Sequence, residues 1–192
     1  LTKAPYLVVV HPSFPGKTFV ELTAYAKTNP LNFGVSGLGT TIHLGAAWIA
    51  QATRANIVIV PYKGTGQSVP AMIGGQVGLV YSAYPSLAAY VKDGRVRLLG
   101  VTSRKPSRFL PGVPAIADAG LPGYEFESWF GLLAPAKTPR AQIQRINTEV
   151  GRLLRQPQII ERLLAQGVEP AGRGSLLTRR TRAPRSSAAK AA

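Results

Sequence analysis

Short apolar segments alternate with segments of helical spacing over the first hundred residues, and this alternation limits the possible folds most strongly. Strand-like runs are expected at 6–10, 32–35, 57–60, 77–81 and 96–102. Helices are expected between them, at 18–29, 42–49, 69–73 and 87–91. This order predicts an α/β fold with a mainly parallel sheet covered on both faces. Ligands of such sheets bind beyond the carboxyl ends of the strands, so the turns after Val35, Val60 and Tyr81 are expected to open on one crevice.

Turn and capping residues predict where the helices begin and end. Thr18 followed by Glu21 forms a capping-box pattern at the start of the first helix. Gly74 and Gly75 are expected to stop the third helix, because glycine adopts the left-handed conformation of helix ends at no steric cost.

The pattern changes after residue 102. An irregular connection rich in proline, glycine and basic residues is expected at 103–123, followed by a strand-like aromatic segment at 125–133. Thr138 and Pro139 then occupy the favoured cap and first-turn positions of a helix. A second helix is expected over 157–165, with Gly167 ending it.

The stretch from Asn32 to Ala52 is the strongest candidate for a ligand site. A strand-like run leads through a turn into a helix, and the turn contains Ser36, Gly37, Gly39 and Thr40. Glycines let the backbone approach a ligand closely, and the first turn of a helix offers free amides with a partial positive charge. These features favour an anion such as a carboxylate or phosphate. A plain glycine turn that only connects strand and helix explains the same residues equally well.

Two sharper motifs overlap this turn. The glycine spacing resembles that of a phosphate-binding loop, but Thr40 stands where that motif has its lysine, so a nucleoside triphosphate is not expected. The sequence GVSGL begins like the nucleophile elbow of hydrolases, yet Leu38 replaces its closing glycine. A hydrolase using Ser36 also needs a histidine base, and His43 lies too close along the chain to be the usual partner.

The net charge of +15 indicates acidic partners. Six basic residues and no acidic ones lie from Arg173 onward, so the rest of the chain has 17 basic and 8 acidic residues, or +9. This balance suits acidic small molecules, nucleic acid or an anionic surface. The absence of cysteine excludes disulfides, and two separated histidines without clustered acids make a metal site unexpected. Glu125 and Glu127 share a strand face, which is better explained by solvation than by a catalytic pair.

Several long motifs resemble one known family. They are PYKGTGQSVPAMIGGQV (61–77), LLGVTSRKPSRFLPGVP (98–114) and AGLPGYEFESWFGLLAPAKTP (119–139), followed by the helix pair. They resemble the substrate-binding receptors of tripartite tricarboxylate transporters, the Bug family of periplasmic binding proteins, over nearly all of 7–172. The resemblance implies a type II periplasmic-binding-protein-like clamshell, with one lobe nearly complete plus the C-terminal part of the other. Such a clamshell closes on a small carboxylate, aromatic acid or related solute and delivers it to membrane subunits.

The resemblance also divides the chain and assigns its ligand contacts. Residues 1–123 correspond to the second ligand-binding lobe, 124–172 to the crossover strand and helices of the first lobe, and 173–192 to a basic tail expected to be disordered. The ligand-binding positions on this pattern are Ser36, Gly37, Gly39, Thr40, His43 and Ser82. Amino-acid-binding relatives carry an aspartate at the position of Ser82, so an acid without an α-amino group is the expected ligand.

The chain departs from the family pattern at both ends. The family's first hundred or so residues, including a loop that supplies half of the ligand contacts, are not in this chain. The chain begins at Leu1 without methionine or a signal peptide, so we expect that a leader has been removed or that upstream sequence is missing. After Gly172 the basic tail replaces the expected terminal amphipathic helix, which predicts a truncated gene product or a frame change near Arg173. Side chains of the incomplete first lobe would then be exposed and prone to aggregation, namely Phe126, Trp129, Phe130 and Leu132.

The resemblance therefore implies a periplasmic, monomeric solute receptor without cofactor or metal, and the absence of a catalytic constellation favours a non-enzymatic one. Its expected partners are a small organic anion and the membrane subunits of a tripartite transporter, and as a fragment it lacks half of its ligand contacts. Two alternatives stay open. A basic nucleic-acid-binding protein would lose affinity steeply with salt, although no groove-reading motif supports specific nucleic-acid binding. A serine hydrolase would use Ser36 as its nucleophile.

Overall fold

The computed structural model describes residues 1–171, and the predicted basic tail lies outside them. The elements of the first hundred residues are β1 (Thr2–Val10), α1 (Phe19–Thr28), β2 (Leu31–Ser36), α2 (Thr41–Thr53), β3 (Ile57–Tyr62), α3 (Thr65–Ile73), β4 (Leu79–Ala83), α4 (Tyr84–Lys92) and β5 (Arg97–Val101). They are followed by β6 (Glu127–Phe130), α5 (Arg140–Leu153), α6 (Pro157–Ala165) and β7 (Glu169–Pro170). Each strand and helix expected before residue 102 is present.

Five strands form the main sheet in the order β3-β2-β4-β1-β5. Strands β2, β3 and β4 pair in parallel, whereas β1 is antiparallel to both β4 and β5. Four of the five strands therefore run in one direction, as the expected mainly parallel sheet requires. The reversed β1 was not anticipated. The C-terminal end of β1 therefore lies at the same end of the sheet as the first residue of β2.

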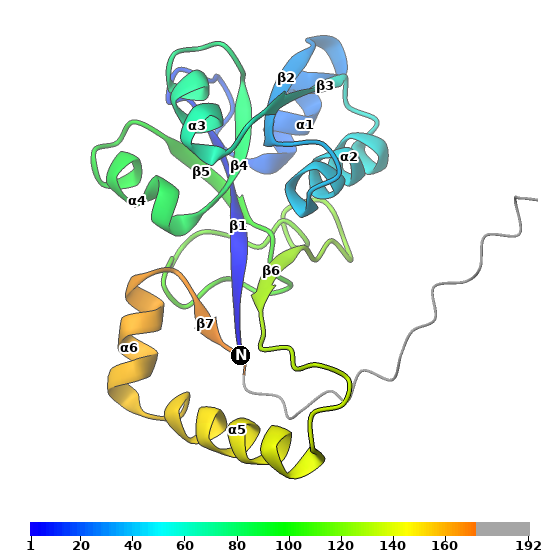
Figure 1. Ribbon diagram of the computed structural model, residues 1–192. Coiled ribbons are helices and arrows are strands. Elements are labelled where there is room, and N and C mark those ends of the chain that lie inside the picture. Colours follow the sequence, from blue (N-terminus) through cyan, green and yellow to red (C-terminus); the bar gives the residue numbers. More distant parts are fainter. Residues whose placement is uncertain (172–192) are drawn as a thin grey trace, which may run out of the picture.

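Strand β1 belongs to two sheets. Its second half, from Tyr6 to Val10, lies inside the main sheet, while its first half pairs antiparallel with β6 and β7. The long blue strand of Figure 1 accordingly runs from the lower part of the molecule into the main sheet. An ion pair between Lys3 Nζ and Glu127 Oε2, 2.9 Å apart, joins β1 to β6. The pairing of Glu127 with Lys3 supports a structural role for this carboxylate.

Helices cover both faces of the main sheet, as expected (Figure 1). Buried side chains of α1 and α2, such as Phe19 and Ile49, pack on one face. Those of α3 and α4, such as Met72 and Leu87, pack on the other face. Successive residues of a strand point to opposite faces, so the central strands bury side chains in both layers and need continuous apolar sequences.

Helix ends follow the sequence with one exception. Thr18 and Glu21 form the predicted capping box, and Gly75 ends α3 at a φ of +76°. Thr138 does not cap α5. The N-cap residue of α5 is Pro139, which has no side-chain hydrogen bond, so the helix begins one residue later than predicted. Thr138 lies in the preceding turn, where its amide donates to the carbonyl of Pro135.

The segment after residue 124 is much less buried than the main sheet. Neither α5 nor α6 contains a fully buried residue, and Trp129 is 71% and Leu133 87% exposed. The expected exposure of Trp129, Phe130 and Leu132 is confirmed. The predicted exposure of Phe126 is wrong, because its ring packs against Trp48 and the main core.

Candidate functional site

The predicted site residues meet where β2 and β4 end side by side. After β2 the chain turns to α2 on one face of the sheet, and after β4 it turns to α4 on the other face. Such a divergence between neighbouring parallel strands is the usual ligand position in α/β sheets. The register places Gly34 beside Val80, and Ser36 and Ser82 each follow two residues later on their own strands.

The loop between β2 and α2 is held by its own hydrogen bonds. Gly37 and Gly39 have φ angles of +92° and +73°, in the left-handed region that favours glycine. The Oγ1 of Thr40 donates to the carbonyl of Gly37 at 2.9 Å and accepts from the amide of His43 at 3.2 Å, which caps α2. Thr40 thus joins the loop to the first turn of α2.

One of the expected anion-binding amides already has a partner within the protein. The amide of Gly39 donates to the imidazole Nδ1 of His43 at 3.2 Å. Among residues 1–171, no acceptor is found for the amides of Leu38, Thr41 or Ile42. The last two belong to the first turn of α2, where the helix dipole favours negative charge. This end of α2 therefore offers unpaired donors to an anion.

Ser82 differs from the other predicted residues because it is completely buried. It follows Val80 on the face covered by α3 and α4, and its Oγ has no hydrogen-bond partner in the part of the chain that the structure describes. The Oγ of Ser68 on α3 is buried and unpaired in the same way. Ser36 is half-buried. Ligand contacts of Ser36, Gly37, Gly39, Thr40, His43 and Ser82 remain predictions.

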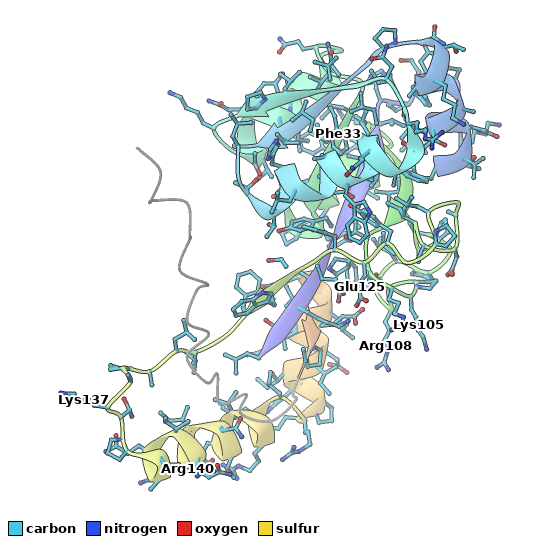
Figure 2. The ribbon with its side chains drawn as sticks, turned by 90° about the vertical axis from the view of Figure 1, so that its right-hand side faces the viewer. Phe33, Lys105, Arg108, Glu125, Lys137 and Arg140 are labelled. Atoms are coloured by element: carbon cyan, nitrogen blue, oxygen red, sulfur yellow. The ribbon has the colours of Figure 1, made fainter. Side chains whose placement is uncertain are left out.

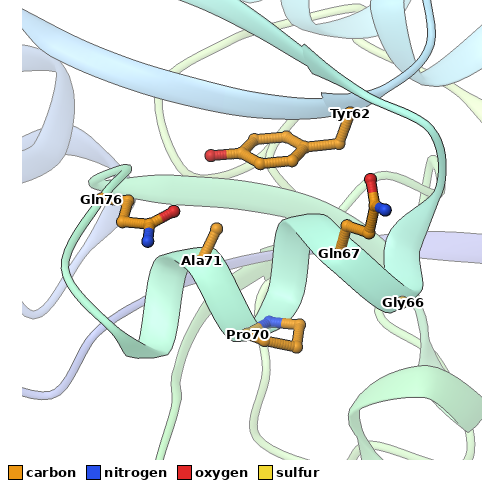
Figure 3. A pocket seen from close by; sticks show the side chains of 6 residues that line it. All are labelled: Tyr62, Gly66, Gln67, Pro70, Ala71 and Gln76. Carbon is orange, nitrogen blue, oxygen red and sulfur yellow. The ribbon is translucent and has the colours of Figure 1, made fainter.

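A surface hollow lies beside the ends of β2 and β3, on the face of the sheet that α3 covers. Tyr62, which pairs with Ser36 in the register of β2 and β3, lies over α3 (Figure 3). The hollow is lined by Tyr62, Gly66, Gln67, Pro70, Ala71 and Gln76. It does not include the loop of Gly39, so the loop and the hollow are neighbouring features rather than one enclosed cavity.

Three tyrosines outside the predicted site residues support the N-terminal part of α2. The hydroxyl of Tyr6 lies 2.9 Å from Thr41 Oγ1, and its ring stacks on Tyr81 with centroids 6.1 Å apart. The hydroxyl of Tyr81 hydrogen-bonds that of Tyr124, which donates to the carbonyl of Gly45 at 3.1 Å. Burial raises the pKa of both Tyr81 and Tyr124, so both hydroxyls stay neutral at physiological pH. Tyr6 and Tyr81 lie inside otherwise apolar strands, which is a sequence signal, whereas Tyr124 lies in the connection before β6 and has none.

The geometry gives little support to the alternative functions. The His43 ring contacts the Gly39 amide, and no hydrogen bond within residues 1–171 joins Ser36 to a histidine. The basic side chains labelled in Figure 2 come from two separate segments, with Lys105 and Arg108 in the connection after β5 and Lys137 and Arg140 just before and at the start of α5. Over the same residues, no group of three His, Cys, Asp or Glu side chains is placed to hold a metal. No helix described for this chain is long and apolar enough to cross a bilayer.

Comparison with known proteins decides the family. The profile of the tripartite tricarboxylate transporter family receptor matches residues 1–183. This chain belongs to that receptor family. A curated relative, the UPF0065 protein in the tcbD-tcbE intergenic region of Pseudomonas sp. strain P51, is 36% identical over 171 residues, which cover 88% of this chain and 51% of the relative.

Solved structures of similar proteins confirm the expected fold. R. palustris Rpa4515 with adipate has 35% sequence identity and a TM-score of 0.81, over 91% of this chain and 59% of that chain. MatC from Rhodopseudomonas palustris with bound malate has 27% identity and a TM-score of 0.73, over 88% and 58%. The receptor-family resemblance and the periplasmic-binding-protein fold are thus confirmed. The chain spans about half the length of most curated relatives it matches.

Proposed function

We propose that this chain provides the second ligand-binding lobe of a periplasmic receptor for a small carboxylate that lacks an α-amino group. Residues 1–123 form this lobe, and 124–171 belong to the lobe opposite. The receptor acts as a monomer, catalyses no reaction and delivers its ligand to the membrane subunits of a tripartite transporter. Family membership supports the transporter partnership and the periplasmic location.

The loop between β2 and α2 carries the proposal. Its unpaired amides at Thr41 and Ile42 lie at the positive end of a helix of 13 residues, beside the divergence of β2 and β4. Amides in this position favour a carboxylate over a neutral group. Two similar structures are Rpa4515 with adipate and MatC with bound malate, which supports a small dicarboxylate as the ligand class.

The surroundings of the loop also favour an acid over an amino acid. Between Ser36 and Thr53 the chain carries no aspartate or glutamate, and Ser82 on the neighbouring strand is neutral. An ammonium group at this site would lose its hydration without gaining a carboxylate partner. The receptor is therefore expected to prefer malate to aspartate, which differ by a hydroxyl in place of an ammonium group.

Calorimetric titration of the full chain with adipate, malate and aspartate tests the proposal. Heat is expected from adipate and malate and much less from aspartate. Leu38→Glu places a negative charge beside the unpaired amides at a side chain that is 68% exposed, so it should weaken malate binding by about tenfold without unfolding the loop. Val20→Glu on α1, where the side chain is 54% exposed, is the matched control and should bind like the wild type. No heat from either acid, or equal loss in both variants, would reject the proposal.

A further inference from the structure

His43 occupies an unusual position in the loop between β2 and α2. It is the only residue from Ser36 to Thr53 whose side chain can carry charge near neutral pH. Its Nδ1 accepts a hydrogen bond from the Gly39 amide at 3.2 Å. A ring nitrogen that accepts must be unprotonated, so the neutral ring carries its proton on Nε2. The neutral ring of His43 is thus held in one tautomer, and it accepts from one of the amides of the loop.

Protonation of His43 is incompatible with this contact. The imidazolium carries a proton on both nitrogens, so Nδ1 and the Gly39 amide would both be donors facing each other. The amide would be released, and an anion placed between the two groups could accept from both, with a charge-assisted bond from the ring. Proton and carboxylate therefore favour the same rearranged state of the loop.

The geometry points to His43 as a proton-linked cap of the anion loop. In the free receptor its neutral ring closes the Gly39 amide, and binding of a carboxylate displaces the ring from this amide and is accompanied by uptake of a proton on His43. This inference rests on the proposed function, since it requires a carboxylate at the loop. Because a carboxylate and a proton each favour the other's binding, affinity rises as the pH falls.

The remaining bonds of the loop do not depend on the protonation of the ring. The main-chain amide of His43, and not its side chain, donates to Thr40 Oγ1, and Thr40 holds the carbonyl of Gly37. Protonation therefore opens a single contact and leaves α2 capped. The switch is local, although a positive charge in the first turn of α2 opposes the helix dipole until an anion binds beside it.

Few other groups near α2 titrate between pH 5 and 8. The strands packed against this helix, β2, β3 and β4, contain no aspartate, glutamate, lysine or arginine. Their titratable side chains are Tyr62 of β3 and Tyr81 of β4. Strand β1 adds Tyr6, and the segment that packs on Trp48 adds Tyr124 and Glu125. None of these groups is an imidazole, the side chain whose ordinary titration range lies between pH 5 and 8.

The other histidine of the chain is a matched control. His11 follows β1 at the opposite edge of the sheet, and its Nδ1 lies 2.7 Å from Ser13 Oγ. It makes a similar local contact far from the loop of Gly39. The variants His43→Gln and His11→Gln each remove one titrating ring, and glutamine keeps an acceptor that can reach a nearby amide.

Two measurements on the full chain test the inference. In the free protein, the amide resonance of Gly39 should move with the titration of the His43 ring protons and with no other group. In calorimetry with adipate between pH 5.5 and 8.5, performed in buffers of different ionisation enthalpy, wild type and His11→Gln should take up as much as one proton per adipate. Their affinity should fall by up to about tenfold per pH unit above the histidine range, whereas His43→Gln should show neither effect.

The outcomes separate the cap from the receptor. The proposed role of His43 is rejected if the Gly39 amide resonance does not change as the His43 ring titrates, or if wild type and His43→Gln take up equal numbers of protons. Binding of adipate would still leave the receptor proposal intact. Absence of heat from adipate and malate at every pH overturns the receptor proposal and, with it, the linkage of His43 to an anion. Proton uptake lost only in His43→Gln, together with a responsive Gly39 amide, supports the inference.

Discussion

Replacing Gly45 by alanine tests how tightly α2 is packed beneath the candidate site. A methyl group at this position would lie 2.9 Å from Tyr81 Cε2, 3.0 Å from the Tyr124 hydroxyl and 3.2 Å from Phe126 Cδ1, whereas ordinary contacts begin at 3.4 Å. All three neighbours are aromatic rings, two of them fully buried, so they cannot move aside freely. Overpacking of this kind costs about 1–3 kcal/mol.

The helix preference of alanine acts in the opposite direction and has to be subtracted. Gly66→Ala in α3 supplies this control, because no atom lies within 4 Å of the added methyl group. Alanine should raise the free energy of unfolding there by a few tenths to about 1 kcal/mol. Gly45→Ala should therefore be about 1–3 kcal/mol less stable than Gly66→Ala.

Urea denaturation of the full chain, followed by circular dichroism, measures this difference. Equal slopes of unfolding free energy against urea would show that both variants expose the same surface on unfolding. If Gly45→Ala proved as stable as Gly66→Ala, the ring cluster would not be packed against α2 as described. The support that Tyr81 and Tyr124 give to the helix of the anion loop would then be disproved.

Two further predictions concern the buried hydroxyls and the exposed rings. Burial raises the pKa of Tyr81 and Tyr124 above the usual value of about 10, so above this pH the unfolded chain loses protons that the folded chain keeps. The free energy of unfolding should not depend on these two groups below pH 10, and above it should fall by up to about 2.7 kcal/mol per pH unit. Tyr124→Phe should remove about half of this slope in urea titrations at pH 9–11. An unchanged slope would contradict the burial of the Tyr124 hydroxyl. Trp129→Lys combined with Leu133→Lys should reduce self-association in sedimentation velocity and leave the melting temperature unchanged, because both side chains are exposed; a lowered melting temperature would show that they pack in the fold.

The sequence predicted the elements of the main sheet because their signals are local. Apolar runs with β-branched residues predicted the strands, and the capping box of Thr18 and the glycine stop at Gly75 form as expected. The strand–turn–helix order around Gly39 indicated a loop with free amides, since helix geometry alone leaves the first amides unpaired. Thr138 is not the cap because α5 begins one residue later, at Arg140 with Pro139 as its N-cap, and Thr138 lies in the preceding turn.

The tertiary structure alone decided how these elements combine. Local periodicity contains no information on strand direction, so the reversed β1 between β4 and β5 was invisible in the sequence. The pairing of Gly34 with Val80, which brings the ends of β2 and β4 together, depends on the register of two strands that are distant in the chain. The bond from Gly39 to His43 depends on the path of one loop and the rotamer of one ring. Residue types determine which groups can donate or accept, but only the folded chain determines which partners are within reach, because hydrogen bonds require distances near 3 Å.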